Sequence, residues 1–295
     1  MQERFYAPLS RSSQAVLLSS ARDNYVAALP AELNLVDRRR SFEAFNIRIS
    51  VRSFAESINQ VERWASQKAG TRLVTFTNVH MLTEGYRSPT FHMIHSKMDL
   101  NCPDGMPLVW LGRLHGKQVT RVCGPEFMLA FCANESHANL RHFFYGGKVG
   151  IAERLIAKLK LHNPSLQVAG YYAPPFRAIS PEEDALIVNQ LNASGADIVW
   201  VSLGCPKQEI WIHEHRVKLR APVLIAVGLA FDIIAGEKKR APKFLRDLGL
   251  EWLYRLMQEP LRLGNRYLES NSLFLYMLLL SAFSRPKNRS LKWTL

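Results

Sequence analysis

The sequence predicts an α/β fold in which a mostly parallel β-sheet is covered by helices. From Phe45 onward, short apolar runs rich in β-branched and aromatic residues alternate with segments whose apolar residues recur at helical spacing. Some of the short runs, such as 197–204 and 223–231, are almost continuously apolar, which is typical of strands buried on both faces of a sheet. A chain of 295 residues is long enough for one large domain or two modest ones.

Cap, turn and periodicity signals predict the individual elements in chain order. Residues 1–42 carry no sustained periodicity and are interpreted as a variable N-terminal extension, and residues 43–242 are assigned to the α/β core. Ser53 and Glu56 form a capping box that is expected to open a helix after a strand at 47–51. The elements expected next are a strand at 73–77, helical segments over 79–97, a strand at 142–147 with a helix behind it, a strand at 166–172, a helix opened by Ser180, Pro181 and Glu183, a strand at 197–204, a helix after Pro206 and a strand at 223–231.

The C-terminal segment, residues 243–295, is predicted to be an amphipathic basic appendage. From Gly236 to the end, twelve Lys or Arg stand against five Asp or Glu, a net of +7 out of a formal charge of +13 for the whole chain. The segment 250–267 sets leucines against arginines, a pattern that suits packing on its own domain, binding to anionic lipid or binding to nucleic acid. The apolar run Leu273–Phe283 has about half of the roughly 20 residues that a membrane-spanning helix needs. Because basic residues flank this run on both sides, we expect it to lie at an anionic membrane surface.

Composition excludes several other classes of protein. Hydrophobic residues make up 47% and charged residues 21% of the chain, which excludes global disorder. The cysteines Cys102, Cys123, Cys132 and Cys205 form no C-x-x-C pair and no zinc-ligand spacing, as expected in a reducing cytoplasmic compartment. The apolar stretch near the N-terminus is too short for the core of a signal peptide, so no export signal is expected.

Candidate ligand-binding residues follow the predicted strands, because open α/β sheets bind ligands at the carboxyl ends of their strands. Gly146, Gly147 and Gly204 either let backbone amides approach a diphosphate or merely turn the chain. No Walker A sequence and no complete G-x-G-x-x-G is present to decide between these alternatives. Asp104 stands between a proline and a glycine, where it either closes a tight turn or serves as a general base on a rigid loop.

Other polar residues at strand ends are candidates for contacts to a sugar or a nucleotide. Asp232 suits gripping a sugar hydroxyl or capping the next turn, and Gln208 and Glu209 stand near a helix start, where the helix dipole stabilises a carboxylate in any case. Hydroxyl, amide and imidazole groups collect at the end of the strand at 73–77, from Thr75, Thr77, Asn78 and His80. No Asp has another Asp two residues away, so the D-x-D pattern that holds Mg²⁺ or Mn²⁺ is absent and no metal cofactor is expected.

Seven segments carry a more specific signal when they are taken together and in order. They are TFTNVHMLTEGYRSPTF (75–91), DLNCPDGMPLVWLGRLHG (99–116), RVCGPEFML (121–129), FFYGG (143–147), VSLGCPKQEIWI (201–212), VGLAFDIIAGEKKRAP (227–242) and LEWLYRLMQEPLRLGNRY (250–267). Together they resemble the WecG/TagA/CpsF family of glycosyltransferases. This resemblance implies a Rossmann-like α/β body with a helical C-terminal appendage that docks on a membrane.

The same resemblance implies a bacterial enzyme that uses a UDP-sugar donor and a polyprenyl-diphosphate-linked saccharide acceptor. The transferred sugar would be glucose, N-acetylmannosamine or its uronic acid, in exopolysaccharide or cell-envelope polymer synthesis. Such an enzyme would work as a peripheral protein at the cytoplasmic face of the inner membrane.

The resemblance also assigns roles to individual residues. Asp104 would be the base of an inverting transfer, and Thr75 or Thr77 with Asn78 would line the sugar pocket. Gln208 and Asp232 match positions expected at the nucleotide sugar. The appendage residues Arg255, Arg262 and Arg266 are expected to meet diphosphate charge, and with amides near Gly147 and Gly204 they would replace a metal ion.

Two other classes of function compete with this interpretation. A basic α/β protein can bind nucleic acid, because Lys and Arg neutralise any polyanion. The basic residues here stand beside apolar side chains and do not interleave with aromatic ones, so no nucleic-acid partner is expected. A nucleotide-binding oxidoreductase would need a fuller dinucleotide fingerprint. The oligomeric state stays open, with a homo-oligomer among the alternatives.

Overall fold

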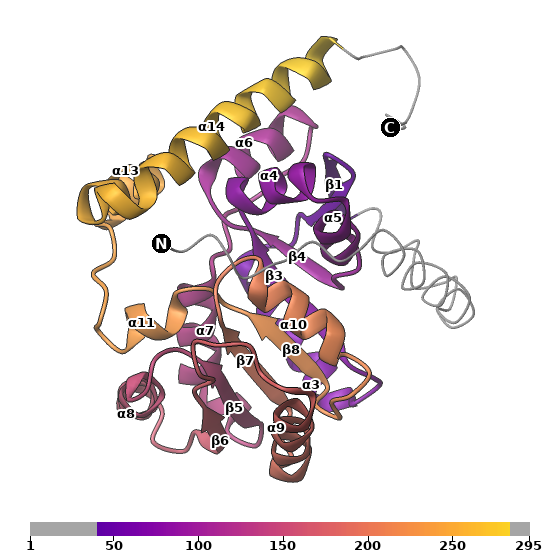
Figure 1. Cartoon of the computed structure of the whole chain (residues 1–295), viewed down its shortest axis with the longest axis vertical. Coiled ribbons are helices and arrows are strands. Elements are labelled where there is room, and N and C mark those ends of the chain that lie inside the picture. The colour runs from indigo at the N-terminus through magenta and orange to yellow at the C-terminus, as the bar shows by residue number, and fades with distance from the viewer. Residues whose placement is uncertain (1–39, 284–295) are drawn as a thin grey trace. The chain divides into compact units, whose positions relative to one another are not determined.

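The structure is a computed structural model that describes residues 40–283, so most of the predicted N-terminal extension and the basic tail after Phe283 lie outside the described residues. Within that range, six strands form a parallel sheet in the order β4-β3-β8-β7-β5-β6 (Figure 1). They are β3 (Arg72–Thr77), β4 (Leu100–Pro103), β5 (Arg141–Gly146), β6 (Gln167–Tyr172), β7 (Ile198–Ser202) and β8 (Val223–Ala226). The predicted fold class, an α/β fold with a mostly parallel sheet, is confirmed.

Helices pack on both faces of this sheet, because consecutive residues of a strand point to opposite faces. On one face, Phe144 of β5 and Trp200 of β7 pack against apolar residues of α3, α7, α8 and α11. On the other face, their chain neighbours Phe143 and Val199 pack against residues of α9 and α10. The helices of the body are α3 (Phe54–Gln67), α4 (Val79–Arg87), α5 (Pro89–Ser96), α6 (Met106–Leu114), α7 (Gly124–Ala133), α8 (Ile151–His162), α9 (Pro181–Ser194), α10 (Lys207–His215) and α11 (Ala230–Ile234), with a short 3₁₀ turn at Glu135–His137.

Two helices begin at the capping boxes that the sequence predicts. The Ser53 hydroxyl accepts the Glu56 N–H at 3.3 Å, and the Glu56 carboxylate accepts the Ser53 N–H at 2.8 Å. Ser180 and Glu183 make the same reciprocal pair at the start of α9, at 3.2 and 2.9 Å. Each pair satisfies two backbone donors that the first turn of a helix leaves without partners.

The structure differs from the predicted elements in several places. β1 (Ser41–Ala44) pairs antiparallel with β2 (Ile47–Ser50), so regular structure begins inside the segment interpreted as an extension. β4 is a strand of four residues, too short to show a periodicity in the sequence. β8 ends at Ala226 and not at 231, because Gly228 turns the chain with a φ of 59° and α11 begins two residues later.

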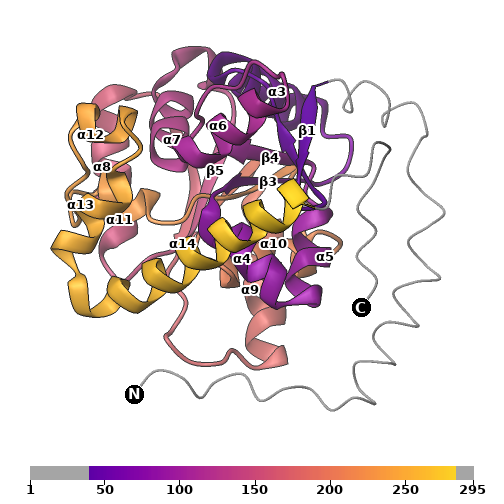
Figure 2. The same cartoon turned by 90° about the horizontal axis from the view of Figure 1, so that it is seen from above.

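The predicted appendage forms a C-terminal arm of three helices, α12 (Lys243–Asp247), α13 (Glu251–Gln258) and α14 (Pro260–Phe283). The segment 250–267 is therefore divided between two helices, which meet at Glu259 and Pro260. α12 and α13 contain no buried residue, whereas α14 is anchored through Phe274, which packs with Leu82 of α4 and Leu108 of α6. Figures 1 and 2 both show α14 lying along α4. Between residues 40 and 283, we find no helix that combines the length and apolar character needed to cross a membrane.

Candidate active site

Asp104 lies where the two adjacent strands β3 and β4 end. Its N–H donates to the carbonyl of Thr77 at 2.7 Å, which continues the β3–β4 pairing by one residue and fixes the turn. The next residue, Gly105, has a φ of 102°, a conformation that other residues rarely adopt. The Asp104 side chain is half-buried, and among residues 40–283 it makes no hydrogen bond or ion pair. The structure thus holds an unpaired carboxylate at the carboxyl edge of the sheet.

Opposing charges surround this carboxylate. Burial and the neighbouring Glu251 raise the pKa of Asp104 to about 7, against the lowering effect of Arg255, Arg121 and Arg240. Glu251 itself pairs with Arg255 at 2.8 Å and with Arg121 at 3.4 Å. A carboxyl group whose pKa lies near neutrality accepts and releases a proton readily, as a general base must.

A second carboxylate, Glu126 at the start of α7, gathers arginines from three segments. It pairs with Arg121 at 3.5 Å, with Arg240 at 3.0 Å and with Arg246 of α12. Arg240 also approaches the Cys123 thiol, with 2.9 Å between Nη2 and Sγ. These contacts tie the arm and the loop after α11 to the turn before α7, beside Asp104.

The sequence patterns did not mark Arg121, Arg240 or Glu251 as site residues. Arg240 belongs to the R-A-P end of a segment that carries the family resemblance, and Glu251 stands four residues before Arg255, at the spacing of a helical ion pair. These two features are the signals in the sequence that point to Arg240 and Glu251. Their convergence on Asp104 depends on the tertiary structure, because they come from three separate segments.

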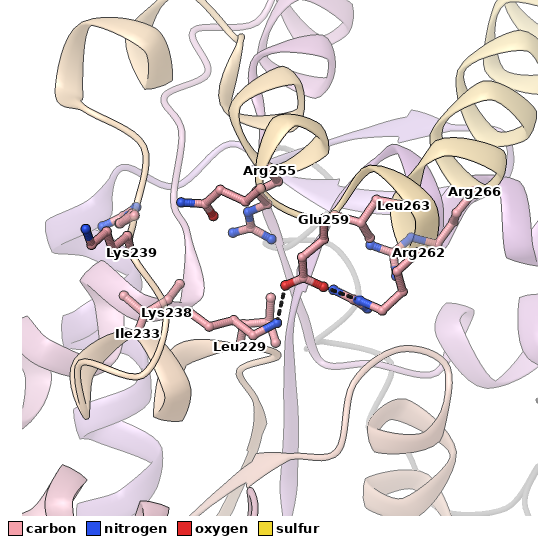
Figure 3. Close-up of a pocket in the computed structure, with 11 residues that line it drawn as sticks. Leu229, Ile233, Lys238, Lys239, Arg255, Glu259, Arg262, Leu263 and Arg266 are labelled. Atoms are coloured by element: carbon pink, nitrogen blue, oxygen red, sulfur yellow. Dashed lines mark hydrogen bonds and ion pairs between the residues drawn. The ribbon is translucent and has the colours of Figure 1, made fainter.

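A basic pocket lies between the loop after α11 and the arm. It encloses about 400 Å³, including space open to solvent. Its lining, as far as the described residues go, is Leu229, Ile233, Lys238, Lys239, Arg240, Arg255, Gln258, Glu259, Arg262, Leu263 and Arg266. The predicted residues Arg255, Arg262 and Arg266 are thus brought together, from two helices, opposite Lys238 and Lys239 (Figure 3). Such a concentration of cations suits a diphosphate.

Asp232 lies in the first turn of α11, so the prediction that it ends a strand is wrong. Its backbone carbonyl accepts the N–H groups of Glu237 at 2.8 Å and Lys238 at 3.1 Å, which shapes the loop that carries the pocket lysines. Burial raises the pKa of the Asp232 carboxyl, although Lys238 and Lys148 oppose the shift. Asp232 is therefore a half-buried carboxyl next to the basic pocket.

Gln208 and Glu209 form a buried network and not an exposed contact surface. The solvent-exposed fractions of Gln208 and Glu209 are 4% and 0%, respectively. The Gln208 amide accepts the Gly228 N–H at 3.0 Å and donates to Glu209 Oε1 at 2.7 Å, and Thr75 Oγ1 donates to the same Glu209 oxygen at 3.4 Å. Burial raises the pKa of Glu209 to about 7, despite these hydrogen bonds. The network connects α10 to β3 and to the loop after β8, so both residues position loops in this structure.

The other polar residues at the end of β3 also have structural partners. Thr77 is fully buried, and its hydroxyl lies 2.8 Å from His95 Nε2. The Asn78 side chain accepts the Met81 N–H at 3.1 Å and so caps α4, while the residue stays half-buried. Of the residues predicted here, Asn78 is the one that combines partial exposure with a position at the strand end.

His80 lies against the arm, where its Nδ1 is 3.4 Å from the Ser270 hydroxyl of α14. Burial lowers the pKa of His80 to about 4, with further lowering by Arg266 and Arg87, so the ring is neutral near pH 7. It contacts the helix that carries Arg266 and does not line the pocket itself. In this structure His80 supports the position of the arm.

The three predicted glycines differ in what surrounds them. A Cβ on Gly146 would lie 2.4 Å from the carbonyl oxygen of Ser202, so a side chain is excluded there by the neighbouring strand. The N–H of Gly147 already donates to that carbonyl at 3.0 Å, so it is not available to a phosphate in this conformation. A Cβ on Gly204, whose φ is 77°, would meet no described atom within 4 Å beyond its chain neighbours, so a ligand has room to approach the backbone there.

Comparisons with known proteins identify the family to which the chain belongs. The profile of the Glycosyl transferase WecG/TagA/CpsF family matches residues 42–288, most of the chain. The chain is 30% identical over 203 residues, 68% of its length, to the N-acetylglucosaminyldiphosphoundecaprenol N-acetyl-beta-D-mannosaminyltransferase of Bacillus spizizenii, of which the match covers 76%. It is 27% identical over 202 residues, again 68% of its length, to the enzyme of the same description from Bacillus subtilis, with 77% of that protein covered. The chain therefore belongs to the WecG/TagA/CpsF family of glycosyl transferases.

Proposed function

We propose that the protein transfers N-acetylmannosamine from a UDP-sugar to N-acetylglucosamine carried on undecaprenyl diphosphate, with inversion at the anomeric carbon. The choice of sugar and acceptor rests on the names of the two Bacillus relatives, which are N-acetylmannosaminyltransferases that act on N-acetylglucosaminyldiphosphoundecaprenol. This choice selects N-acetylmannosamine from the three sugars that the family resemblance allows. The observation that carries the proposal is the unpaired Asp104 carboxylate beside a pocket lined by arginines and lysines.

The proposed chemistry is a single displacement. The Asp104 carboxylate takes the proton of an acceptor hydroxyl, and the oxygen of that hydroxyl attacks the anomeric carbon of the donor as the bond to UDP breaks. Negative charge develops on the leaving diphosphate, and the cations of the basic pocket stabilise it as the bond lengthens. Arg255 would serve both events, because it lines the pocket and also lowers the pKa of Asp104.

Donor binding would use the loops that the buried network holds. Gly204 leaves its backbone open to a ligand, and Asn78 and Asp232 offer half-buried polar side chains near the same edge of the sheet. Gln208 and Glu209 would act through these loops, since the Gly228 N–H bonds to Gln208. The proposed reaction needs no metal ion, because fixed cations meet the diphosphate charge.

The arm would bring this site to a lipid-linked acceptor at the cytoplasmic face of the membrane. The arm, including the turn after α12, exposes large apolar side chains, namely those of Phe244, Leu248, Trp252, Leu253, Met257, Leu261, Leu268, Leu275, Tyr276 and Leu279. Exposed apolar side chains beside basic residues favour the headgroup region of an anionic membrane. This placement makes the protein peripheral, and it predicts no requirement for nucleic acid.

Transfer assays test the catalytic proposal. Purified enzyme would be given UDP-N-acetylmannosamine, UDP-glucose or UDP-N-acetylmannosaminuronic acid with a short-chain polyprenyl-diphosphate N-acetylglucosamine, with and without a chelator. We expect transfer from the first donor, unaffected by chelator, and a product anomer opposite to that of the donor. Transfer from another donor alone, retention of the anomeric configuration or loss of activity with chelator would each contradict the corresponding part of the proposal.

Removal of the arm tests the membrane role. A chain that ends near residue 245 lacks α13 and α14, and it should no longer sediment with anionic vesicles, whereas the full chain should. Titration of the full chain with DNA at rising salt separates this role from general binding to polyanions. Equal vesicle binding by the two chains would show that the arm is not the membrane contact.

A further inference from the structure

The basic pocket contains its own anion. Six of the described residues that line it are Lys or Arg, and Glu259 is the acid among them. Glu259 follows α13 and stands directly before Pro260, the first residue of α14. Its backbone is held on both sides, because its N–H donates to the Arg255 carbonyl at 3.0 Å and its own carbonyl accepts the Leu263 N–H at 2.9 Å. The carboxylate is thus fixed at the corner of the arm, inside the pocket.

The two oxygens of Glu259 are shared between cations of different elements. Oε1 lies 2.6 Å from the Lys238 ammonium, which belongs to the loop after α11. Oε2 pairs with the Arg262 guanidinium of α14. Figure 3 shows the carboxylate between these two side chains, with Arg255 and Arg266 on the arm side of the same pocket. The hydrogen bonds from Arg262 and Lys238 lower the pKa of Glu259 to about 2, so the group stays charged at any pH at which the enzyme would work.

A diphosphate that enters this pocket meets cations that are already paired. A phosphate group offers a cation the same kind of charged oxygen that Glu259 offers, so the two compete for Lys238 and Arg262. We infer that Glu259 is a built-in anion that holds Lys238 and Arg262 while the pocket is empty and yields both to the diphosphate of a substrate. The inference rests on the proposed function in one respect, namely that the ligand of the pocket is a substrate diphosphate.

The exchange has two physical consequences. First, the cations stay clustered in the empty enzyme, because the carboxylate screens a repulsion that would otherwise spread long flexible side chains. Second, binding is selective for ligands with enough charge to replace a carboxylate, so singly charged anions are disfavoured. The Lys238–Glu259 pair also joins the loop after α11 to the arm, and on binding the diphosphate takes over that connection.

Calorimetric titration of the full chain with UDP and with inorganic pyrophosphate at low salt tests the inference. Removing the competing charge in Glu259→Gln should tighten binding of both ligands by about 3- to 10-fold. The matched control is Glu269→Gln, which also removes one negative charge from the arm. Glu269 lies in α14, pairs with Arg87 at 3.1 Å and does not line the pocket. The control should bind as the wild type does. In the double variant Lys238→Gln, Glu259→Gln the gain should shrink, because one of the two released cations is gone.

The outcomes separate this inference from the proposed function. If the wild type binds UDP and pyrophosphate but Glu259→Gln binds them equally or more weakly, Glu259 is a structural strut and the inference is wrong. If the wild type binds neither ligand, the proposed diphosphate site fails whatever the variant does. If circular dichroism shows that Glu259→Gln does not fold, Glu259→Asp is titrated in its place. Aspartate keeps the negative charge, but its shorter side chain holds Lys238 and Arg262 less closely. A smaller tightening by that variant supports the exchange, and unchanged or weaker binding overturns it.

Discussion

Asp104 and Glu209 are two carboxyl groups at the same edge of the sheet, and burial raises the pKa of each to about 7. Their surroundings differ. Glu209 is completely buried, with Gln208 and Thr75 as hydrogen-bond donors, whereas Asp104 is half-buried and has no partner among the described residues. A raised pKa therefore does not identify a catalytic group in this protein. Partial exposure and two oxygens without a hydrogen-bond partner among the described residues distinguish the candidate base from the group that positions loops.

The largest contrast is expected from the amide variants of the two groups. Asp104→Asn removes the base but keeps the size of the side chain, so transfer should fall by about 10²- to 10⁴-fold while UDP binding survives. Glu209→Gln keeps the hydrogen-bonding shape of the network, so transfer should fall by less than about tenfold. Steady-state transfer rates and UDP titrations check both. Full activity of Asp104→Asn would remove this residue from the mechanism.

The contrast should reverse when stability is measured on alanine variants. Glu209→Ala leaves the buried Gln208 amide and Thr75 hydroxyl without their acceptor and opens a cavity, at a cost of about 2 to 4 kcal/mol. Asp104→Ala removes a carboxylate that has no partner to lose, so its effect on unfolding should stay within about 1 kcal/mol. Urea unfolding at pH 7 compares the two. A larger loss from Asp104→Ala would mean that it, too, is a structural group.

How far these roles follow from the sequence depends on the type of signal. The strands and the capped helices carry local signals, and the structure confirms them, as at Ser53 and Ser180. Asp104 was a candidate from its turn and from the family resemblance. Its environment was not predictable, because Arg121, Arg240 and Glu251 come from segments far apart in the chain and meet only in the folded protein.

The burial of other candidate residues was not predictable from the sequence either. Gln208 and Glu209 stand at a helix start after a strand, where a polar residue commonly faces a ligand. The first turn of α10 instead points them under the loops, toward Gly228 and Thr75. Similarly, Gly147 follows a strand as a phosphate-binding glycine would, but Ser202 takes its N–H. Which side of a turn faces solvent depends on tertiary packing, and a single sequence does not encode that in a local pattern.

A smaller effect is expected when activity and stability are measured as functions of pH. Asp104 should govern the first and Glu209 should contribute to the second. Asp104 acts as a base only when deprotonated, so kcat/KM should fall as pH drops below about 7. Glu209 binds its proton more tightly in the folded than in the unfolded chain. Its contribution to stability is therefore fully present below the unfolded pKa, near 4.5, and is lost as pH rises through about 7. In Glu209→Gln the decline of Tm between about pH 4.5 and pH 7 should shrink, while the pH profile of kcat/KM keeps its shape. A displaced activity profile in that variant would assign the catalytic titration to Glu209.

The smallest predicted effect tests whether the arm tunes Asp104 or only binds diphosphate. Arg255 lines the basic pocket and also lowers the pKa of Asp104, whereas Arg262 lines the pocket without acting on Asp104. Both Arg255→Gln and Arg262→Gln should raise the KM for the UDP-sugar, by up to about tenfold, because each removes a cation from the site. Only Arg255→Gln should also move the acid limb of the kcat/KM profile to higher pH, by a fraction of a unit, since it leaves Glu251 to repel the Asp104 carboxylate. Equal profiles for the two variants would mean that the arm supplies charge to the diphosphate alone, and that the environment of the base is set by the body of the protein.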